Sequence, residues 1–176
     1  MPRDAEWIPA CVGIGSNLDD PARQVEIAIA GIGALPDTRL HSRSSLYRNP
    51  PLGPPDQPDY VNAVAIVLTR LAPHPLLGAL QAIEAAQGRD RGAGPRWGPR
   101  IIDLDLLTYG LRRIADASLT IPHPGIAERN FVLFPLVEVA PRMSVPGLGS
   151  AELLASRVDG SALEKLDRNQ APLLFD

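Results

Sequence analysis

Prolines and glycines divide this 176-residue sequence into short regular segments, and this division limits the folds that it can adopt. The chain contains nineteen prolines and fifteen glycines, and many of them gather at residues 49–59 and 88–99. Proline removes a backbone donor and fixes φ, and glycine disfavours helices, so both stretches are expected to be irregular loops. The sheet and the helices must come from the segments between them.

Hydrophobic periodicity in those segments alternates between strand and helix patterns. Asp20 and Pro21 provide an N-cap and a first-turn residue for one helix, and Gly88 stops another. We expect strands at residues 10–14, 40–47, 60–69 and 101–109, and helices at residues 21–35 and 75–87.

The order βαββαβ is that of a ferredoxin-like α+β fold, in which two helices cover one face of an antiparallel sheet. Residues after Tyr109 are expected to add short helices and edge strands, including a helix at residues 151–158. No repeat or linker divides the chain, so we expect a single domain over residues 1–176.

Composition narrows the range of partners. A formal net charge of −3 gives no support to general nucleic-acid binding. No apolar run is long enough for a membrane span or a signal peptide, and Cys11 is alone in an apolar run, where we expect a core residue. These features predict a cytoplasmic protein of the reducing compartment without nucleic-acid or membrane partners, and we expect a monomer.

Two aspartates in the last long strand form the first candidate site. Asp103 and Asp105 project on the same face, about 6.5–7 Å apart along the strand, whereas Leu104 and Leu106 point into the core. Two carboxylates on one half-buried face repel each other unless a cation lies between them, and Mg²⁺ suits such oxygen ligands. The alternative is a solvated sheet face that binds nothing.

A run of arginines precedes this strand and favours the metal interpretation. Arg89, Arg91, Arg96 and Arg100 lie in a loop that could bind a polyphosphate carried with Mg²⁺. The chain prefers arginine generally, with Lys165 as its single lysine, but this preference does not explain why arginines cluster here.

Four motifs resemble those of the 6-hydroxymethyl-7,8-dihydropterin pyrophosphokinase family of the folate pathway. They are GSNL at 15–18, NPPLGPPDQPDYVNAV at 49–64, RWGPRIIDLDLL at 96–107 and IPHPGIAERNFVLFPLVEVAP at 121–141. The resemblance covers residues 11–141. It implies an enzyme that transfers the β,γ-pyrophosphoryl group of ATP to the hydroxymethyl group of the dihydropterin, releasing AMP, with two Mg²⁺ ions.

The resemblance also assigns roles to individual residues. Asp103 and Asp105 match metal ligands, and Arg89 and Arg100 match catalytic arginines that bind the triphosphate. For the nucleotide it implies Gln81, Glu84, Arg91, Arg96, Trp97, Leu106, Thr120, His123 and Arg129. For the pterin it implies Asn49, Pro50, Pro51, Leu52, Tyr60, Asn62, Trp97 and Phe131, with the Tyr60 and Phe131 rings on either side of the heterocycle.

Several of these residues also have simpler explanations. Tyr60 could be a core residue, His123 a turn residue between two prolines, and Gln81 and Glu84 part of a solvated helix face. The arginine loop has one more residue than in some relatives and carries Gly92 where they have lysine. Ser118 and Pro124 replace an ATP-contacting arginine and an aromatic residue, which leaves the finer ATP contacts open.

Three other functions compete with this interpretation. A Mg²⁺-dependent hydrolase or nucleotidyltransferase could use the same aspartates, but it would not need Tyr60, Asn62 and Phe131. A ferredoxin-like sensor or interaction domain would not need the arginines and both carboxylates. A P-loop ATPase is excluded, because the sequence has no GxxxxGK motif.

Overall fold

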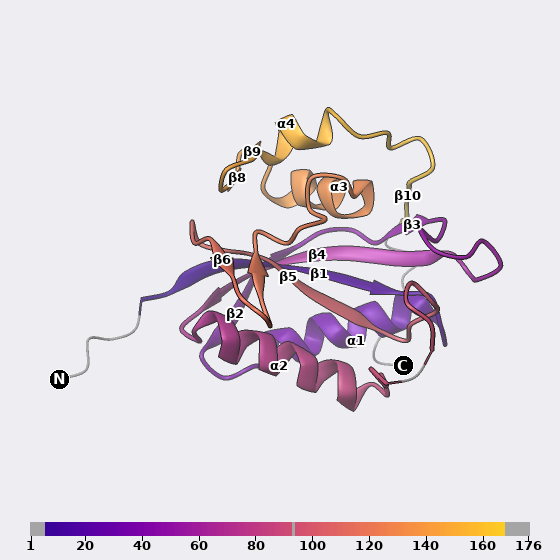
Figure 1. Cartoon of the computed structure of the whole chain (residues 1–176), viewed down its shortest axis with the longest axis horizontal. Coiled ribbons are helices and arrows are strands. Elements are labelled where there is room, and N and C mark those ends of the chain that lie inside the picture. Colours follow the sequence, from indigo (N-terminus) through magenta and orange to yellow (C-terminus); the bar gives the residue numbers. More distant parts are fainter. Residues whose placement is uncertain (1–5, 93, 168–176) are drawn as a thin grey trace.

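A six-stranded antiparallel sheet lies at the centre of the fold, with helices on both of its faces (Figure 1). The computed structural model describes residues 6–92 and 94–167. The strands are β1 (Ile8–Ser16), β2 (Thr38–Arg43), β3 (Tyr47–Asn49), β4 (Tyr60–Thr69), β5 (Asp103–Tyr109) and β10 (Glu164–Lys165). Their order is β10-β3-β4-β1-β5, and β2 also pairs with β4, which confirms the predicted ferredoxin-like arrangement.

The predicted second strand is divided into β2 and β3. Ser44 interrupts it by exchanging hydrogen bonds with Val64, since the Ser44 N–H donates to the Val64 carbonyl and the Ser44 hydroxyl accepts from the Val64 N–H, both at 2.9 Å. Serine side chains compete in this way with the regular ladder. The prediction of one continuous strand at residues 40–47 was therefore wrong in this detail.

Helices α1 (Pro21–Gly33) and α2 (Pro73–Ala86) cover one face of the sheet (Figure 1). The Asp20 side chain accepts the Arg23 N–H, as predicted for the N-cap of α1. α2 begins at Pro73, the residue expected to open it, two residues before the expected range of 75–87. A proline is well tolerated there, because in the first turn it lacks only an N–H that would have no helical partner.

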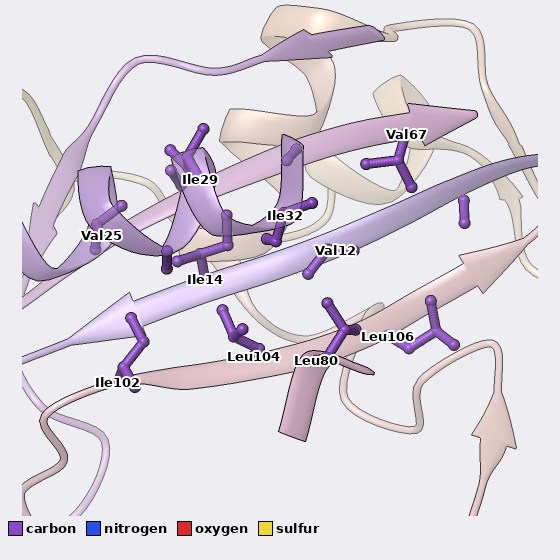
Figure 2. Close-up of a cluster of buried hydrophobic side chains, with 14 of the residues drawn as sticks. Val12, Ile14, Val25, Ile29, Ile32, Val67, Leu80, Ile102, Leu104 and Leu106 are labelled. Carbon is purple, nitrogen blue, oxygen red and sulfur yellow. The ribbon is translucent and has the colours of Figure 1, made fainter. Parts of the chain in front are cut away.

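The core beneath these helices joins all the long elements. Figure 2 shows Val12 and Ile14 of β1 packed with Ile29 of α1, Leu80 of α2 and Leu104 of β5. Leu104 and Leu106 are buried here, so the alternation of β5 directs its aspartates to the opposite face, as predicted.

Helices α3 (Asn130–Val139) and α4 (Ala151–Ala155) lie on that opposite face (Figure 1). Leu133 and Leu136 of α3 pack there with Val64 and Leu107 of the sheet, and Cys11 belongs to the same cluster. Burial raises the pKa of the Cys11 thiol to about 11, in agreement with the predicted core role. The predicted helix at residues 151–158 is limited to α4.

Two small hairpins complete the connections after β5. They are β6 (Ile114–Ala115) with β7 (Thr120–Ile121), and β8 (Ser144–Val145) with β9 (Gly149–Ser150). None of the helices in the described part of the chain combines the length and the apolar character that a membrane span requires.

Candidate active site

The candidate site begins with a row of residues that crosses the sheet on the face of α3. Asp103 lies opposite Gly15 and Asp105 opposite Gly13 in the pairing of β5 with β1. Directly opposed residues of paired strands project on the same face. Because both opposed residues are glycines, no side chain of β1 stands directly beside either carboxylate.

The same row continues from β1 into β4. Gly15 lies opposite Asn62, whose side chain is almost fully buried and donates to Asn49 Oδ1 at 2.5 Å. A Cβ atom at position 15 would lie 2.5 Å from Asn62 Oδ1, closer than a real Cβ contact. Gly15 therefore provides both the space beside Asp103 and the space that the Asn62 amide occupies.

A cavity of about 250 Å³ lies over this row. Most of the residues expected from the sequence line it, and they come from β3, the loop before β4, β4, β5, the arginine loop and the segments before and at the start of α3. These expected residues are Asn49, Leu52, Tyr60, Asn62, Arg96, Trp97, Arg100, Asp103, Asp105, His123, Arg129 and Phe131. The cavity thus brings aromatic rings, a buried amide and two carboxylates to one place.

Positive charge surrounds the two carboxylates. Asp103 Oδ1 accepts from Arg89 Nη1 at 2.5 Å and from Arg100 Nη1 at 3.3 Å. Asp105 has longer contacts, 3.5 Å from Oδ2 to Arg129 Nη1 and 3.7 Å from Oδ1 to His123 Nε2. Burial, together with the nearby Asp103 charge, raises the pKa of Asp105 to about 6.

This donor set fits a cation that is shared with a phosphate ligand. In residues 6–92 and 94–167, no group of three or more His, Cys, Asp or Glu side chains could hold a metal by itself. Mg²⁺ commonly takes only one or two carboxylates and completes its shell with substrate phosphates and water. Asp103 Oδ2 accepts no hydrogen bond from the described residues and is free to bind such an ion.

His123 lies beside Asp105 with a defined orientation. Its Nδ1 accepts the Gly125 N–H at 3.1 Å, so a neutral ring carries its proton on Nε2, which faces Asp105. Burial, followed by the Arg129 charge, lowers the pKa of His123 and favours this neutral form.

Glu84 connects the arginine loop to β5, the strand that carries the two aspartates. Its side chain is buried and accepts from Arg89 Nη1, from Arg91 Nη2 and from the Leu104 N–H. Burial raises the pKa of Glu84, and the Leu104 hydrogen bond and the two guanidinium charges oppose this shift. Glu84 is therefore not on a solvated helix face, although it lies outside the cavity.

The arginines also line a second hollow of about 570 Å³ next to the cavity. Arg96 and Arg100 border both spaces, whereas Arg89 and Arg91 border only the second one. A ligand with several negative charges could thus extend from the carboxylates into a region bordered by four arginines, although Asp19 and Asp90 also border it.

Some expected site residues lie outside both spaces. Gln81 and Thr120 are exposed, and Leu106 is buried in the core beneath the sheet. Pro50 and Pro51 flank the lining residues Asn49 and Leu52 without lining either space themselves.

Sequence reasoning also missed six residues that line the cavity, four of which are glycine or alanine. These are Gly13, Ile14, Gly15, Gly53, Ala63 and Val132. Gly15 opens the GSNL motif, so this motif was the available signal, but the sequence did not indicate that its glycine would lie between Asp103 and Asn62.

Comparison with known proteins identifies the family. The chain matches the family of 7,8-dihydro-6-hydroxymethylpterin-pyrophosphokinase (HPPK) over residues 11–141. The chain belongs to this family. The resemblance stated from the four motifs is thereby confirmed.

Curated relatives in the family carry the same enzyme name, 2-amino-4-hydroxy-6-hydroxymethyldihydropteridine pyrophosphokinase. The Pseudomonas aeruginosa protein is 48% identical over 146 residues, which is 82% of this chain and 89% of the relative. The Haemophilus influenzae protein is 48% identical over 139 residues, 79% of this chain and 86% of the relative. The Methylorubrum extorquens protein is 42% identical over 158 residues, 90% of this chain and 98% of the relative.

Solved structures show the same fold in a longer protein. A crystal structure of a Plasmodium falciparum HPPK-DHPS variant with pterin and p-hydroxybenzoate has a TM-score of 0.70 at 11% identity. Another variant of the Plasmodium falciparum protein, solved with pteroate, has a TM-score of 0.66 at 13% identity. This chain is covered to 93% and 88%, but it spans only 47% and 43% of those chains.

Proposed function

We propose that this protein transfers the pyrophosphoryl group of ATP to the hydroxymethyl group of 6-hydroxymethyl-7,8-dihydropterin and releases AMP, with two Mg²⁺ ions. The row across the sheet carries this proposal, because Gly15 separates the Asn62 amide from the Asp103 carboxylate by one strand. A pterin held by Asn62 would thus present its hydroxymethyl group toward a polyphosphate held at Asp103. Family membership supports the same activity.

The pterin would bind at the aromatic and amide side of the cavity. Tyr60, Trp97 and Phe131 provide faces for a flat heterocycle, while Asn62 and Asn49 provide in-plane hydrogen bonding. These groups fix the ring and orient the attacking oxygen, which lowers the entropic cost of the reaction.

The polyphosphate would bind at the charged side of the cavity. Asp103 and Asp105 would hold the Mg²⁺ ions, which supply positive charge to the phosphate oxygens and align the attacking and leaving groups. Arg100 and Arg89 would contact the same phosphates, since Arg100 lines both the cavity and the arginine-rich hollow, and Arg89 lines the hollow. The hydroxymethyl oxygen of the pterin forms a bond to the β-phosphorus and gives up its proton, which is released with the products. The bond between this phosphorus and the oxygen bridging to the α-phosphate breaks, so that AMP leaves.

Enclosure of the reacting groups would protect the transfer from water. Arg96, Trp97 and Arg100 of the arginine loop line the cavity, and water is the competing nucleophile. Arg91, Arg96, His123 and Arg129 would serve the nucleotide, and the same role remains a proposal for Gln81, Glu84, Leu106 and Thr120.

One assay tests this function. The protein is mixed with ATP, Mg²⁺ and the dihydropterin, and the expected products are AMP and the pyrophosphorylated pterin. ADP would indicate transfer of one phosphoryl group, and pterin-independent hydrolysis would favour the hydrolase alternative. Asp103→Asn and Asp105→Asn should each lower turnover about a hundredfold or more, whereas Asp159→Asn, at an exposed turn, should not.

We also propose that the chain works as one monomeric catalytic domain in the cytoplasm, without nucleic-acid partners. The low net charge and the buried thiol of Cys11 are compatible with this setting. Size-exclusion chromatography with light scattering measures the oligomeric state.

A further inference from the structure

Asn17, in the turn after β1, has a buried amide that joins three segments around the cavity. Its Nδ2 donates to Gln57 Oε1 and to the Pro58 carbonyl, both at 3.0 Å. Its Oδ1 accepts the Arg100 N–H at 2.8 Å, and its own N–H donates to the Arg100 carbonyl at 3.0 Å. Both side-chain donors are thus used, and the Arg100 backbone is fixed at both of its polar atoms.

Gln57 extends this connection to Trp97, a residue of the arginine loop that lines the cavity. Its Nε2 donates to the Trp97 carbonyl at 2.9 Å. Gly53 packs against the same residue so closely that a Cβ atom there would overlap the Trp97 carbonyl oxygen and lie 2.8 Å from Trp97 Cβ. The Tyr60 hydroxyl donates to the Gly98 carbonyl at 3.1 Å.

The Trp97 backbone has a conformation that requires such support. Its φ is 67°, in the left-handed region, which residues with a Cβ atom seldom adopt. A conformation of this kind persists only where the surrounding structure holds it. Gln57, Gly53 and Tyr60 contact the backbone of this part of the loop.

We propose that Asn17 and Gln57 are positioning residues, which hold the backbones of Arg100 and Trp97 so that the guanidinium faces Asp103 and the indole borders the cavity. Arg100 Nη1 lies 3.3 Å from Asp103 Oδ1, and Trp97 lines the cavity. Neither amide lines the cavity itself, so both act through the residues that they hold. This inference rests on the proposed function, because it concerns groups that would bind the pterin and the polyphosphate.

Fluorescence of Trp97 provides a test that needs no substrate. The chain has two tryptophans, so Trp7→Phe leaves Trp97 as the single reporter. In this background Gln57→Ala should free the Trp97 segment and increase quenching by acrylamide toward the value of the unfolded protein. Gln57 is partly exposed, so the variant should remain folded.

Steady-state kinetics provide the second measurement. Gln57→Ala should lower kcat about tenfold, which corresponds to the loss of one or two hydrogen bonds, while the KM for ATP changes little. Asn17→Ala should have a larger effect on kcat, because it releases Arg100 as well. The matched control is Ser156→Ala, which removes an exposed side-chain hydrogen bond to the Leu153 carbonyl in α4, away from the arginine loop.

The outcomes separate this inference from the proposed function. If the wild type releases AMP and Gln57→Ala retains both its turnover and its Trp97 quenching, the positioning role is wrong and the function stands. A lower melting temperature with unchanged quenching would also overturn the positioning role. If the wild type releases no AMP, the proposed function is wrong, and the quenching measurement still decides whether Gln57 holds Trp97.

Discussion

Glu84 of α2 and Asp103 of β5 accept hydrogen bonds from the same nitrogen atom, Arg89 Nη1. The first carboxylate is buried and the second borders the cavity, so Arg89 connects the helix on one face of the sheet to the site on the other. The Leu104 N–H also donates to Glu84, at 2.7 Å. The start of β5 is thereby attached to α2 by both side-chain and backbone hydrogen bonds.

Removal of Glu84 should destabilise the protein strongly. Glu84→Ala leaves the largely buried Arg89 guanidinium and the Leu104 N–H without this acceptor, and should lower the free energy of unfolding by about 3 kcal/mol. Urea denaturation measures this change. The control is Glu164→Ala, which breaks an exposed pair with Arg48 and should cost less than about 1 kcal/mol. Equal losses in the two variants would contradict the role assigned to Glu84.

Arg100→Ala should impair turnover much more than pterin binding. Its guanidinium borders both the cavity and the arginine-rich hollow, where the triphosphate would lie. We expect kcat to fall about a hundredfold or more, because the lost charge stabilises the transition state. Arg89→Ala should behave similarly in the kinetics.

The control for Arg100→Ala is Arg157→Ala, an exposed arginine after α4, which should leave kcat unchanged. Isothermal titration measures the pterin dissociation constant in each variant. A dissociation constant that rises as much as the rate falls would place Arg100 on the pterin rather than on the phosphates.

Much of the fold followed from local sequence patterns. Asp20 and Pro21 start α1 as predicted, and the alternation of β5 correctly directs Leu104 into the core. The sequence did not predict the bounds of α3, because Pro135 lies inside this helix and proline normally ends or kinks a helix. Burial of the apolar side chains of this helix against the sheet offsets that cost, and burial depends on tertiary structure that periodicity does not contain.

The candidate site was predictable only where side-chain chemistry marks it. Asp103, Asp105 and the arginines stood out by charge, and the motifs indicated Asn62 and Phe131. Strand register places Gly15 between Asp103 and Asn62, and register between distant strands is not visible in a single sequence. The hydrogen bonds of Asn17 join residues 40 and 83 positions away, so its positioning role also emerged only from the structure.

Gly15→Ala should weaken pterin binding by displacing Asn62. The new methyl group would lie 2.5 Å from Asn62 Oδ1, so this amide must move, and the pterin dissociation constant should rise about tenfold or more. Gly78→Ala is the matched control, since nothing lies within 4 Å of its Cβ position. Gly78 is inside α2, so this control should leave binding unchanged and stabilise the helix by up to about 1 kcal/mol. Unchanged binding in Gly15→Ala would show that the Asn62 position does not determine affinity.

Ionised Glu138 should stabilise the folded protein, and this stabilisation should be lost at acidic pH. This carboxylate of α3 accepts from the Tyr47 hydroxyl at 2.7 Å and from the Ser45 N–H at 3.0 Å. Burial alone would raise its pKa, but these hydrogen bonds and the Lys165 charge together lower the pKa below the ordinary value for a glutamate. A lowered folded-state pKa means that the stabilisation is present above the unfolded-state pKa and is lost as pH falls through the folded-state pKa.

Glu138→Gln should therefore be less stable than the wild type by about 1–3 kcal/mol at pH 7, and the difference should shrink as the pH falls below about 4. Urea denaturation at pH 7 and at several acidic pH values measures both quantities. Glu152→Gln changes an exposed carboxylate of α4 and should shift stability by less than about 0.5 kcal/mol at each pH. A Glu138→Gln difference that stays constant down to the lowest pH would mean that the ionised carboxylate is not the source of the stabilisation. The contact between α3 and the Ser45–Tyr47 segment would then depend on the shape of residue 138 rather than on its charge.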